Sequence, residues 1–416
     1  MSDTSGPILA ADGTPLKKKL QQTLFRSRAR AFGLVFPLLA FIIIAFILPI
    51  ILLLSQSVWD SRYADLMPES TKAVAGWDSS TPPTEEMAAA MVTDLVQARE
   101  NKTIGKVATR VNRELSGTRS LFTKTARSAA KLEAPYLGAL IDRDEDWGKI
   151  ETWAAIKVAA KKFNPSYLAS AVDMKYNADG TFEREDEGRR IHVKLFWRTL
   201  EISFLVTVFT LLLGYPVAYL LSTLPVRTSN LLLILVLLPF WTSLLVRTTA
   251  WIAMLQGQGV LNDLFVVFGI ATDEDRFSLI YNKTGTLIAM THILLPFMIL
   301  PLYSVMKTIP PSYVRAAKSM GARPSTAFWR VYFPQSVPGI GAGALLVFIL
   351  AIGYYITPAL VGGQDGQMIS NIIDFHMRRS LNWNLAAALG LVLLVFVLFL
   401  FWLYDRIVGI DNMKLG

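Results

Sequence analysis

The chain has 416 residues, of which 53% are hydrophobic and 18% are charged, with a mean hydropathy of +0.41 and a formal net charge of +9 at pH 7. This composition excludes a disordered chain and an ordinary soluble domain, and it is typical of a protein with several membrane spans. The absence of cysteine excludes disulfides and thiolate metal sites, and three scattered histidines leave little for a histidine-based metal centre.

Six apolar stretches are each long enough to cross a bilayer as a helix. They cover residues 31–54, 196–221, 231–255, 285–306, 337–356 and 385–404. The first contains Pro37 and Pro49 and is too long for the hydrophobic region of a secretory signal, so we expect it to be an uncleaved span. The pattern predicts an all-α membrane protein with six transmembrane helices.

Basic residues are distributed unequally among the short connections. With an inside N-terminus, the cytoplasmic segments are residues 1–30, 222–230, 307–336 and 405–416. They carry fourteen Lys and Arg, whereas the short outer segments, residues 256–284 and 359–384, carry four. Because such residues accumulate on the cytoplasmic side, we expect both termini there. The same segments account for the positive net charge, which therefore gives no reason to expect nucleic-acid binding.

A long polar segment, residues 56–195, separates the first two spans, and this topology places it outside the cytoplasm. Apolar residues recur in it at helical spacing, as at Met87, Met91 and Leu95, so a mostly helical insert domain is expected. An Asp179–Gly180 turn predicts one hairpin near its end. The remaining predicted parts are a basic N-terminal segment (1–30), the first span (31–55), a core with five spans (196–410) and a tail (411–416).

The sequence contains little that indicates catalysis or metal binding. Asp142, Asp144 and Asp146 match the first, third and fifth positions of a calcium-binding EF-hand loop, but Trp147 and Trp153 occupy its sixth and twelfth positions. A solvated acidic turn is the better interpretation. No phosphate-binding loop motif occurs, so we do not expect this chain to hydrolyse ATP, to be an enzyme or to bind a cofactor or metal of its own.

Residues 310–334 follow the fourth span and carry the most informative pattern. They predict two short helices: Ser312 can cap the first, Gly321 can end it, and Pro324 can begin the second, whose apolar side includes Phe328. A basic two-helix segment of this kind suits docking into a groove on a soluble partner. The alternative is a positively charged cytoplasmic loop without a partner.

The run of Ala316–Ala317, Gly321 after three residues, Val331 after nine more and then Phe333–Pro334 resembles the "EAA" loop of ATP-binding-cassette (ABC) importer permeases of the type I architecture. In that family the loop forms a coupling helix that rests on the ATPase subunit. The resemblance implies coupling roles for Arg315, Ala316, Ala317, Gly321, Ala322, Phe328 and Pro334. Arg315 replaces the family's usual glutamate, which suggests a differently charged partner groove.

Residues 196–410 contain further motifs, at 213–219, 238–251, 259–262 and 360–363, that are similar to the spermidine/putrescine-type permeases. The resemblance implies six transmembrane helices of the type I ABC importer permease architecture in a bacterial cytoplasmic (inner) membrane. The chain would form half of a translocation path for a small organic solute, such as a polyamine or related cation. The large insert is not part of the usual permease of this type.

The same resemblance implies a set of partners. These are a second homologous permease subunit, two ATP-binding cassette subunits that use ATP and Mg, an extracytoplasmic solute-binding protein and membrane lipid. A rival hypothesis is a membrane receptor or assembly protein whose insert senses an extracytoplasmic ligand.

Ionisable and aromatic residues near the outer ends of the spans are candidates for the substrate path or a gate. They are Glu201, Trp241, Arg247, Tyr354, Tyr355 and Asp374. Charged groups are costly in lipid, so Glu201 and Arg247 should face the bundle interior, either as a pair or in separate roles near the entrance. The two tyrosines stand where permeases of this type carry gate residues, with an interfacial aromatic belt as the alternative. Asp374 could attract a cation or a delivery protein, or be a solvated loop charge.

Overall fold

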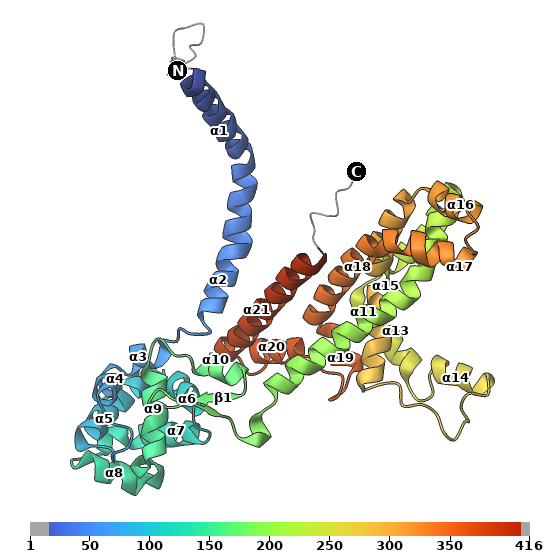
Figure 1. Cartoon of the computed structure of the whole chain (residues 1–416). Coiled ribbons are helices and arrows are strands. Elements are labelled where there is room, and N and C mark those ends of the chain that lie inside the picture. The colour runs from blue at the N-terminus through green and yellow to red at the C-terminus, as the bar shows by residue number, and fades with distance from the viewer. Residues whose placement is uncertain (1–15, 409–416) are drawn as a thin grey trace. The chain divides into compact units, whose positions relative to one another are not determined.

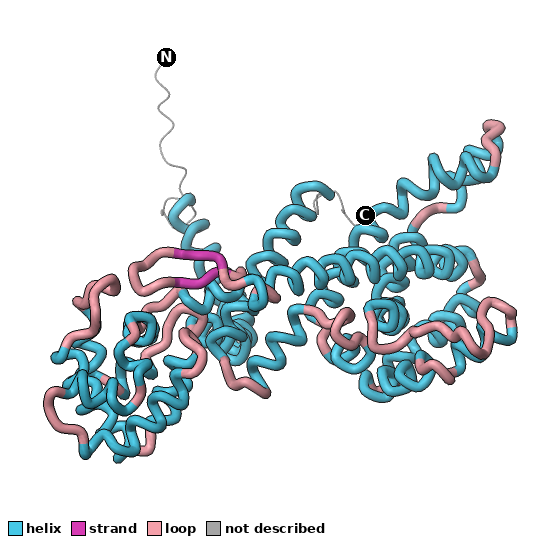
Figure 2. The backbone as a smooth tube through the Cα atoms, turned by 90° about the horizontal axis from the view of Figure 1, so that it is seen from below, coloured by secondary structure: helices cyan, strands magenta, loops and turns pink. Residues whose placement is uncertain are grey.

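The computed structural model describes residues 16–408, and helices dominate this part of the chain (Figures 1 and 2). The chain divides into two compact units, one ending at Gln56 and one beginning at Ser57. Five described helices are long and apolar enough to cross a membrane: Thr23–Ser55, His192–Thr223, Lys283–Thr308, Pro324–Gly353 and Trp383–Arg406. The expected all-helical membrane architecture is confirmed. Residues 1–15 of the predicted N-terminal segment (1–30) and the whole predicted tail (411–416) lie outside the described residues.

The first unit is a long helix made of α1 (Leu16–Ile42), the π-helical turn η1 (Ile43–Ile47) and α2 (Leu48–Ser55). The π turn lies directly before Pro49, whose ring would clash with the carbonyl of Ala45 in a regular helix, and the wider turn avoids that clash. No side chain of η1 or α2 is buried within the described chain. A helix that is apolar on every side requires lipid or partner helices around it.

The insert begins the second unit and contains eight α-helices. They are α3 (Arg62–Leu66), α4 (Pro68–Ala75), α5 (Glu85–Glu100), α6 (Ile104–Asn112), α7 (Thr118–Ser128), α8 (Tyr136–Arg143), α9 (Ile150–Ala160) and α10 (Ser166–Ala171). Two 3₁₀ turns, η2 (Ala129–Lys131) and η3 (Glu145–Gly148), lie between these helices, and a third, η4 (Glu187–Arg189), comes just before the next long helix. Thr84 caps α5, because its hydroxyl accepts a hydrogen bond from the Met87 amide.

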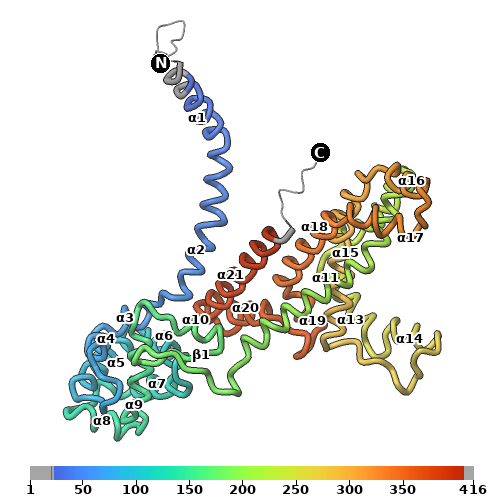
Figure 3. Tube along the Cα trace, in the orientation of Figure 1, coloured from blue at the N-terminus to red at the C-terminus, as the bar shows by residue number. Residues whose placement is uncertain are grey.

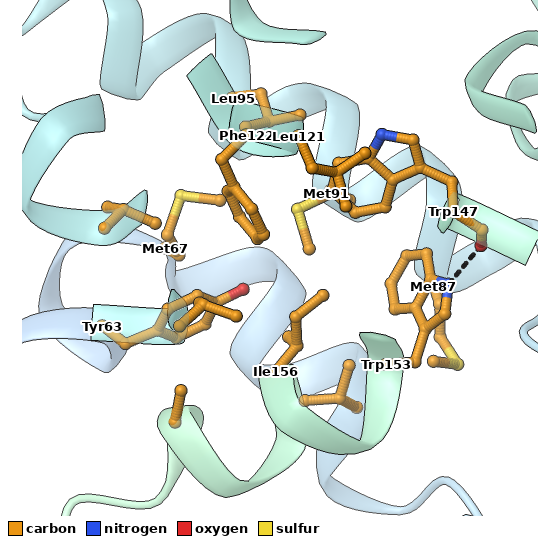
Figure 4. Close-up of a cluster of buried hydrophobic side chains, with 14 of the residues drawn as sticks. Tyr63, Met67, Met87, Met91, Leu95, Leu121, Phe122, Trp147, Trp153 and Ile156 are labelled. Atoms are coloured by element: carbon orange, nitrogen blue, oxygen red, sulfur yellow. Dashed lines mark hydrogen bonds between the residues drawn. The ribbon is translucent and has the colours of Figure 1, made fainter. Parts of the chain in front are cut away.

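Buried side chains from α3 to α9 form the core of the insert, with the largest contributions from α5 and α9 (Figure 4). Met87, Met91 and Leu95 are at most 2% exposed, which confirms the helical periodicity expected from the sequence. Two of the insert's three buried indoles are satisfied, because Trp153 Nε1 donates to the Trp147 carbonyl at 2.7 Å and Trp147 Nε1 donates to a threonine hydroxyl at 2.9 Å. The indole nitrogen of Trp77 has no hydrogen-bond partner among the described residues. The insert thus has its own hydrophobic core.

The predicted hairpin is also present. Strands β1 (Met174–Tyr176) and β2 (Phe182–Arg184) pair antiparallel (Figure 2). Gly180 has a φ of 93°, a conformation that glycine adopts without steric cost, and the Asp179 carboxylate accepts a hydrogen bond from the Thr181 amide at 2.9 Å.

The membrane core is built on three closely packed helices, α11 (His192–Thr223), α15 (Lys283–Thr308) and α18 (Phe333–Gly353). Small residues allow their backbones to approach. A Cβ placed on Gly214 would lie 3.2 Å from Cγ of Met298, and one placed on Gly343 would lie 2.8 Å from Sδ of the same methionine. Gly343 therefore leaves no room for a side chain without a shift of its neighbour, and Gly214 leaves little. The last span is α21 (Trp383–Val408).

The expected continuous helix over residues 231–255 is wrong. The chain instead forms α12 (Val226–Leu237), the 3₁₀ turn η5 (Leu238–Trp241), α13 (Leu244–Leu255) and α14 (Val260–Val267). The two halves, Val226–Trp241 and Leu244–Val267, are bent by 94°. Pro239 cannot donate a backbone hydrogen bond, and Thr242 is extended, so the helix ends there. Six spans result only if this bent pair counts as one, and that number stays a prediction.

A buried polar network and an apolar cluster attach the insert to the last span. Asp60 accepts hydrogen bonds from Arg62 Nε at 2.7 Å and the Tyr167 hydroxyl at 2.8 Å, and its Oδ2 lies 2.9 Å from Nε of Arg110. Arg62 also donates to Asn384 in α21. Burial alone would raise the pKa of Asp60, but the hydrogen bond and the two guanidinium charges outweigh it and lower that pKa from 3.8 to about 2.

Below this network, apolar side chains of α10, α11 and α21 pack together with the helix α20 (Ile369–Arg378). The buried members are Tyr167, Ala171, Leu195, Ile369, Ala388 and Leu389. The insert and the later spans therefore form one compact unit.

Candidate functional site

Residues 310–334 begin with helix α16 (Pro311–Ser319). Pro310 is its N-cap and Pro311 its first residue, so Ser312 lies inside the helix and makes no capping hydrogen bond. The expected Ser312 cap is wrong. The physical reason is that proline at the first helical position has its φ preset for a helix and loses no hydrogen bond there, so the helix starts two residues earlier than a Ser312 cap would allow.

Gly321 ends α16, as the sequence predicts. Its φ is +90°, and two hydrogen bonds close the turn, from the Ala322 amide to the Ala317 carbonyl and from the Gly321 amide to the Lys318 carbonyl, both at 3.0 Å. This is a Schellman motif, in which a residue with positive φ lets the chain reverse and satisfies carbonyls at the helix end. The turn gives α16 a defined end.

The second helix differs from the prediction of two separate short helices. α17 (Pro324–Ala327) starts at Pro324 as expected, but it continues through the π turn η6 (Phe328–Tyr332) into α18. Pro334 lies in the first turn of α18, and the π turn before it avoids the clash of its ring with the Arg330 carbonyl. This connection is thus continuous with a span that runs from Pro324 to Gly353.

The residues named for coupling divide into exposed and inward-facing groups. Arg315, Ala316, Gly321 and Pro334 are exposed, whereas Ala317 is 7% exposed. Phe328 is half-buried. Its ring meets that of Tyr219 edge-on with centroids 5.8 Å apart and stacks on that of Tyr332 at 5.8 Å. Ala322 is also partly buried.

Sequence analysis did not select three large apolar side chains of the same connection. Tyr313, Met320 and Trp329 are 52%, 82% and 61% exposed. The sequence pattern that could have indicated them is the presence of large apolar residues in a segment whose other residues are mostly basic or have small side chains. Exposed apolar groups rimmed by charged side chains are typical of protein interaction sites.

Of the candidate gate residues, Tyr355 and Asp374 come together through Arg378, which the sequence analysis did not select. Arg378 Nη2 donates to the Tyr355 hydroxyl at 2.9 Å, and its guanidinium lies 5.4 Å from the centre of that ring. Its Nε donates to Asp374 at 2.6 Å. Arg378 therefore already contacts the ring of Tyr355 and the carboxylate of Asp374, the two groups that would attract a cation electrostatically.

The loop that carries the two tyrosines is held by α20. Ser370 Oγ donates to the Tyr354 carbonyl at 2.6 Å, and Asn371 Nδ2 donates to the Tyr355 carbonyl at 2.7 Å. These bonds replace the helical partners that the two carbonyls lack after α18 ends.

The pairing of Glu201 with Arg247, one of the two alternatives, does not occur in the structure. Glu201 on α11 forms an ion pair with Lys283, the first residue of α15, because α15 packs along α11. Arg247 lies on α13, and its Nε has no hydrogen-bond partner among the described residues. Trp241 is 87% exposed at the bend after η5. Roles of these residues in a substrate path stay predictions.

The described part of the chain offers no group of three or more His, Asp or Glu side chains that could hold a metal ion. With its apolar helices and an exposed basic connection between two of them, the fold defines a helical integral membrane protein.

Comparisons with known proteins give the family. Residues 203–408 match the family described as binding-protein-dependent transport system inner membrane component. The spermidine/putrescine transport system permease protein PotB of Haemophilus influenzae is 34% identical over 224 residues, which cover 54% of this chain and 78% of that protein. PotB of Escherichia coli is 30% identical over 244 residues, covering 58% of this chain and 87% of that protein. This chain therefore belongs to the ABC importer permeases, in the group of polyamine-type permeases.

Among solved structures, a bacterial alginate ABC transporter in complex with an alginate pentasaccharide-bound periplasmic protein aligns with a TM-score of 0.46 and 18% identity, over 54% of this chain and 80% of that one. The family match begins at residue 203, so the insert lies outside it.

Proposed function

We propose that this permease forms half of the translocation path of an ATP-driven importer for a polyamine or related organic cation, and that residues 310–334 couple it to separate ATPase subunits. A second homologous permease would complete the path, and a solute-binding protein would deliver the solute from the side of the insert. The relatives named as spermidine/putrescine permeases support the solute class. The family membership disfavours the rival hypothesis of a receptor.

The single observation that carries the coupling role is the exposed apolar side chains of α16 and η6. Tyr313, Met320 and Trp329 are exposed on this connection, which also carries the exposed basic residues Arg315 and Lys318. Buried aromatic and apolar anchors surrounded by polar groups dominate binding energy in protein interfaces. The complementary groove on the ATPase should therefore have an apolar floor and an acidic rim.

This surface is firmly connected to the membrane helices. The ring of Phe328 packs against aromatic residues of α11, and the Tyr332 hydroxyl hydrogen-bonds with Ser222 of α11 at 3.1 Å. A displacement of α16 by ATPase subunits would thus move α11 and α18 with it, because packed interiors transmit displacement rather than absorb it.

On the opposite side of the core, Arg378 acts in this proposal as an internal substitute for the transported cation. It holds the Tyr355 ring and the Asp374 carboxylate until a cationic solute competes for them. Entry of the solute would release Arg378, and the tyrosine loop would change its hydrogen bonds.

The coupling proposal is tested by charge reversal at the exposed end of α16. The tagged chain is purified from its native membrane in mild detergent, and the amount of bound ATPase subunit is measured for the wild type, Arg315→Glu and the matched control Arg227→Glu, which reverses another exposed helical arginine, in the first turn of α12. We expect loss of the ATPase subunit from the Arg315 variant only. Equal recovery from both variants, with equal membrane insertion, would refute a docking role for α16.

A further inference from the structure

A cleft of about 690 Å³ lies where α3 and α6 of the insert meet the loop before α21. Arginine and lysine dominate its lining: Arg62, Lys106, Arg110, Arg113 and Arg119. Ser380 and Leu381 contribute the wall from the membrane core. In Figure 3 the short helices of the insert can be followed to α10, which packs against α21.

The carboxylates near this cleft already have cationic partners. Asp60 pairs with Arg62 and Arg110, Glu114 pairs with Arg110 at 2.6 Å, and Asp65 pairs with Lys162 at 3.0 Å.

By contrast, three cations of the lining, Lys106, Arg113 and Arg119, form no ion pair with a carboxylate among residues 16–408. Arg113 donates only to neutral groups, the Leu381 carbonyl at 3.2 Å and the Tyr167 hydroxyl at 3.5 Å. The cleft therefore holds a surplus of positive charge, and cations gathered in this way repel one another unless an anion joins them.

A buried donor provides an independent observation. The Arg110 side chain is 1% exposed and lines the cleft, yet its Nη2 has no hydrogen-bond partner within the described chain. Leaving a buried donor unsatisfied costs about 1–3 kcal/mol, and more when the group is charged. An anionic oxygen bound in the cleft would satisfy this donor and neutralise the surplus charge together.

The position of the cleft along the chain indicates the source of the anion. Leu381 stands two residues before α21, the last span. Two exposed tryptophans are close to the cleft residues in the sequence: Trp383 is 44% exposed and Trp59 is 54% exposed. Exposed tryptophans are typical of the membrane depth at which lipid headgroups lie. Phosphate oxygens are the anionic groups present at that level.

We propose that this cleft binds the phosphate group of an anionic phospholipid, with Lys106, Arg113 and Arg119 as the contacting cations and Arg110 as the buried donor. The bound headgroup would bridge the insert and the start of α21. Free inorganic phosphate offers the same chemistry, so the test must separate the two sources. The proposal does not depend on the coupling role of residues 310–334.

The test uses the full chain in detergent and native mass spectrometry. Short-chain phosphatidylglycerol, short-chain phosphatidylcholine and inorganic phosphate are the probes. The variant carries Lys106→Gln, Arg113→Gln and Arg119→Gln, and the matched control carries Lys124→Gln, Arg127→Gln and Lys131→Gln, three exposed cations of the insert outside the cleft.

We expect the wild type and the control to bind phosphatidylglycerol in preference to phosphatidylcholine, and the cleft variant to bind it at least about tenfold more weakly, since one lost charge-assisted hydrogen bond is already worth about that factor. Retention of the lipid in excess inorganic phosphate identifies a headgroup site, and displacement by phosphate identifies a site for the free anion. Either result supports a phosphate site.

Equal binding by the cleft variant, or equal binding of the two lipids, would overturn the proposal. So would binding of an acidic peptide without binding of either phosphate probe, because that result would indicate a protein partner. If the triple variant does not fold, Lys106→Gln alone serves, because Lys106 is exposed on α6 and its replacement leaves the core intact. It should weaken phosphatidylglycerol binding measurably relative to Lys124→Gln.

Discussion

Replacing Gly321 by valine is the sharpest test of the turn that ends α16. A Cβ at this position would meet no atom within 4 Å, so the substitution adds no steric clash with neighbouring residues. Its cost comes from the backbone, whose φ is +90°. An L-residue with a left-handed backbone costs about 1–2 kcal/mol, and a β-branched residue is among the least suited to it. The population with the closed turn should therefore fall about tenfold.

The assay measures two quantities in the purified complex, the amount of bound ATPase subunit and the stimulation of ATP turnover by solute. Gly321→Val should lower both, whereas Gly321→Asn should retain more of each, because asparagine tolerates a positive φ better than valine. Gly76→Ala is the matched control, since Gly76 also has open space around it but a φ of −92°. Membrane insertion should be normal in all three variants.

Two results would refute this reasoning. Full coupling in Gly321→Val would mean that the closed turn is not needed for docking. A stronger defect in Gly321→Asn than in Gly321→Val would mean that side-chain chemistry, rather than backbone conformation, decides the effect.

Four further predictions concern the insert, the core and the outer cluster. Asp60→Asn should destabilise the insert by about 2 kcal/mol, because Arg110 keeps Glu114 but loses one of its two carboxylate partners, and an unchanged thermal unfolding temperature would contradict this. In the wild type, the low pKa of Asp60 contributes about 2 kcal/mol of stability above pH 4 that is lost as pH falls toward 2, which unfolding measured across that range will detect. Gly343→Leu should lower thermal stability by about 1–3 kcal/mol by pushing α18 away from Met298, whereas Gly353→Ala, with open space, should not. Arg378→Gln should lower the KM for uptake of a cationic solute, and a raised KM would argue against its role as an internal substitute.

Local sequence signals predicted those features whose causes are local. The spacing of Met87, Met91 and Leu95 predicts α5 because only one face of a helix can be buried. Gly321 and Gly180 mark positions of positive φ, which few other residues adopt, and both turns are present. The motif around Ala316–Ala317 and the apolar stretches indicated the family that the comparisons confirm.

Predictions failed where neighbouring residues compete to start a helix, or where several distant residues compete for the same ion-pair partner. Ser312 is an adequate capping residue, but the proline before it starts the helix earlier. Glu201 could reach several cations in a bundle of unknown packing, and the proximity of α15 to α11 selects Lys283. Hydropathy alone could not reveal the bend at Thr242, because the mean hydropathy of an apolar stretch is the same whether the helix is straight or broken.

The sequence by itself determined that this protein is a helical membrane permease with a separate polar insert, because span length, periodicity and turn residues act over short distances along the chain. Only the tertiary structure decided which side chains meet across large separations. It brings Asp60 to Arg110 and Tyr167, attaches the insert to α21 and gathers several cations in one cleft. Such contacts depend on how whole helices pack, and no local pattern of residues specifies that packing.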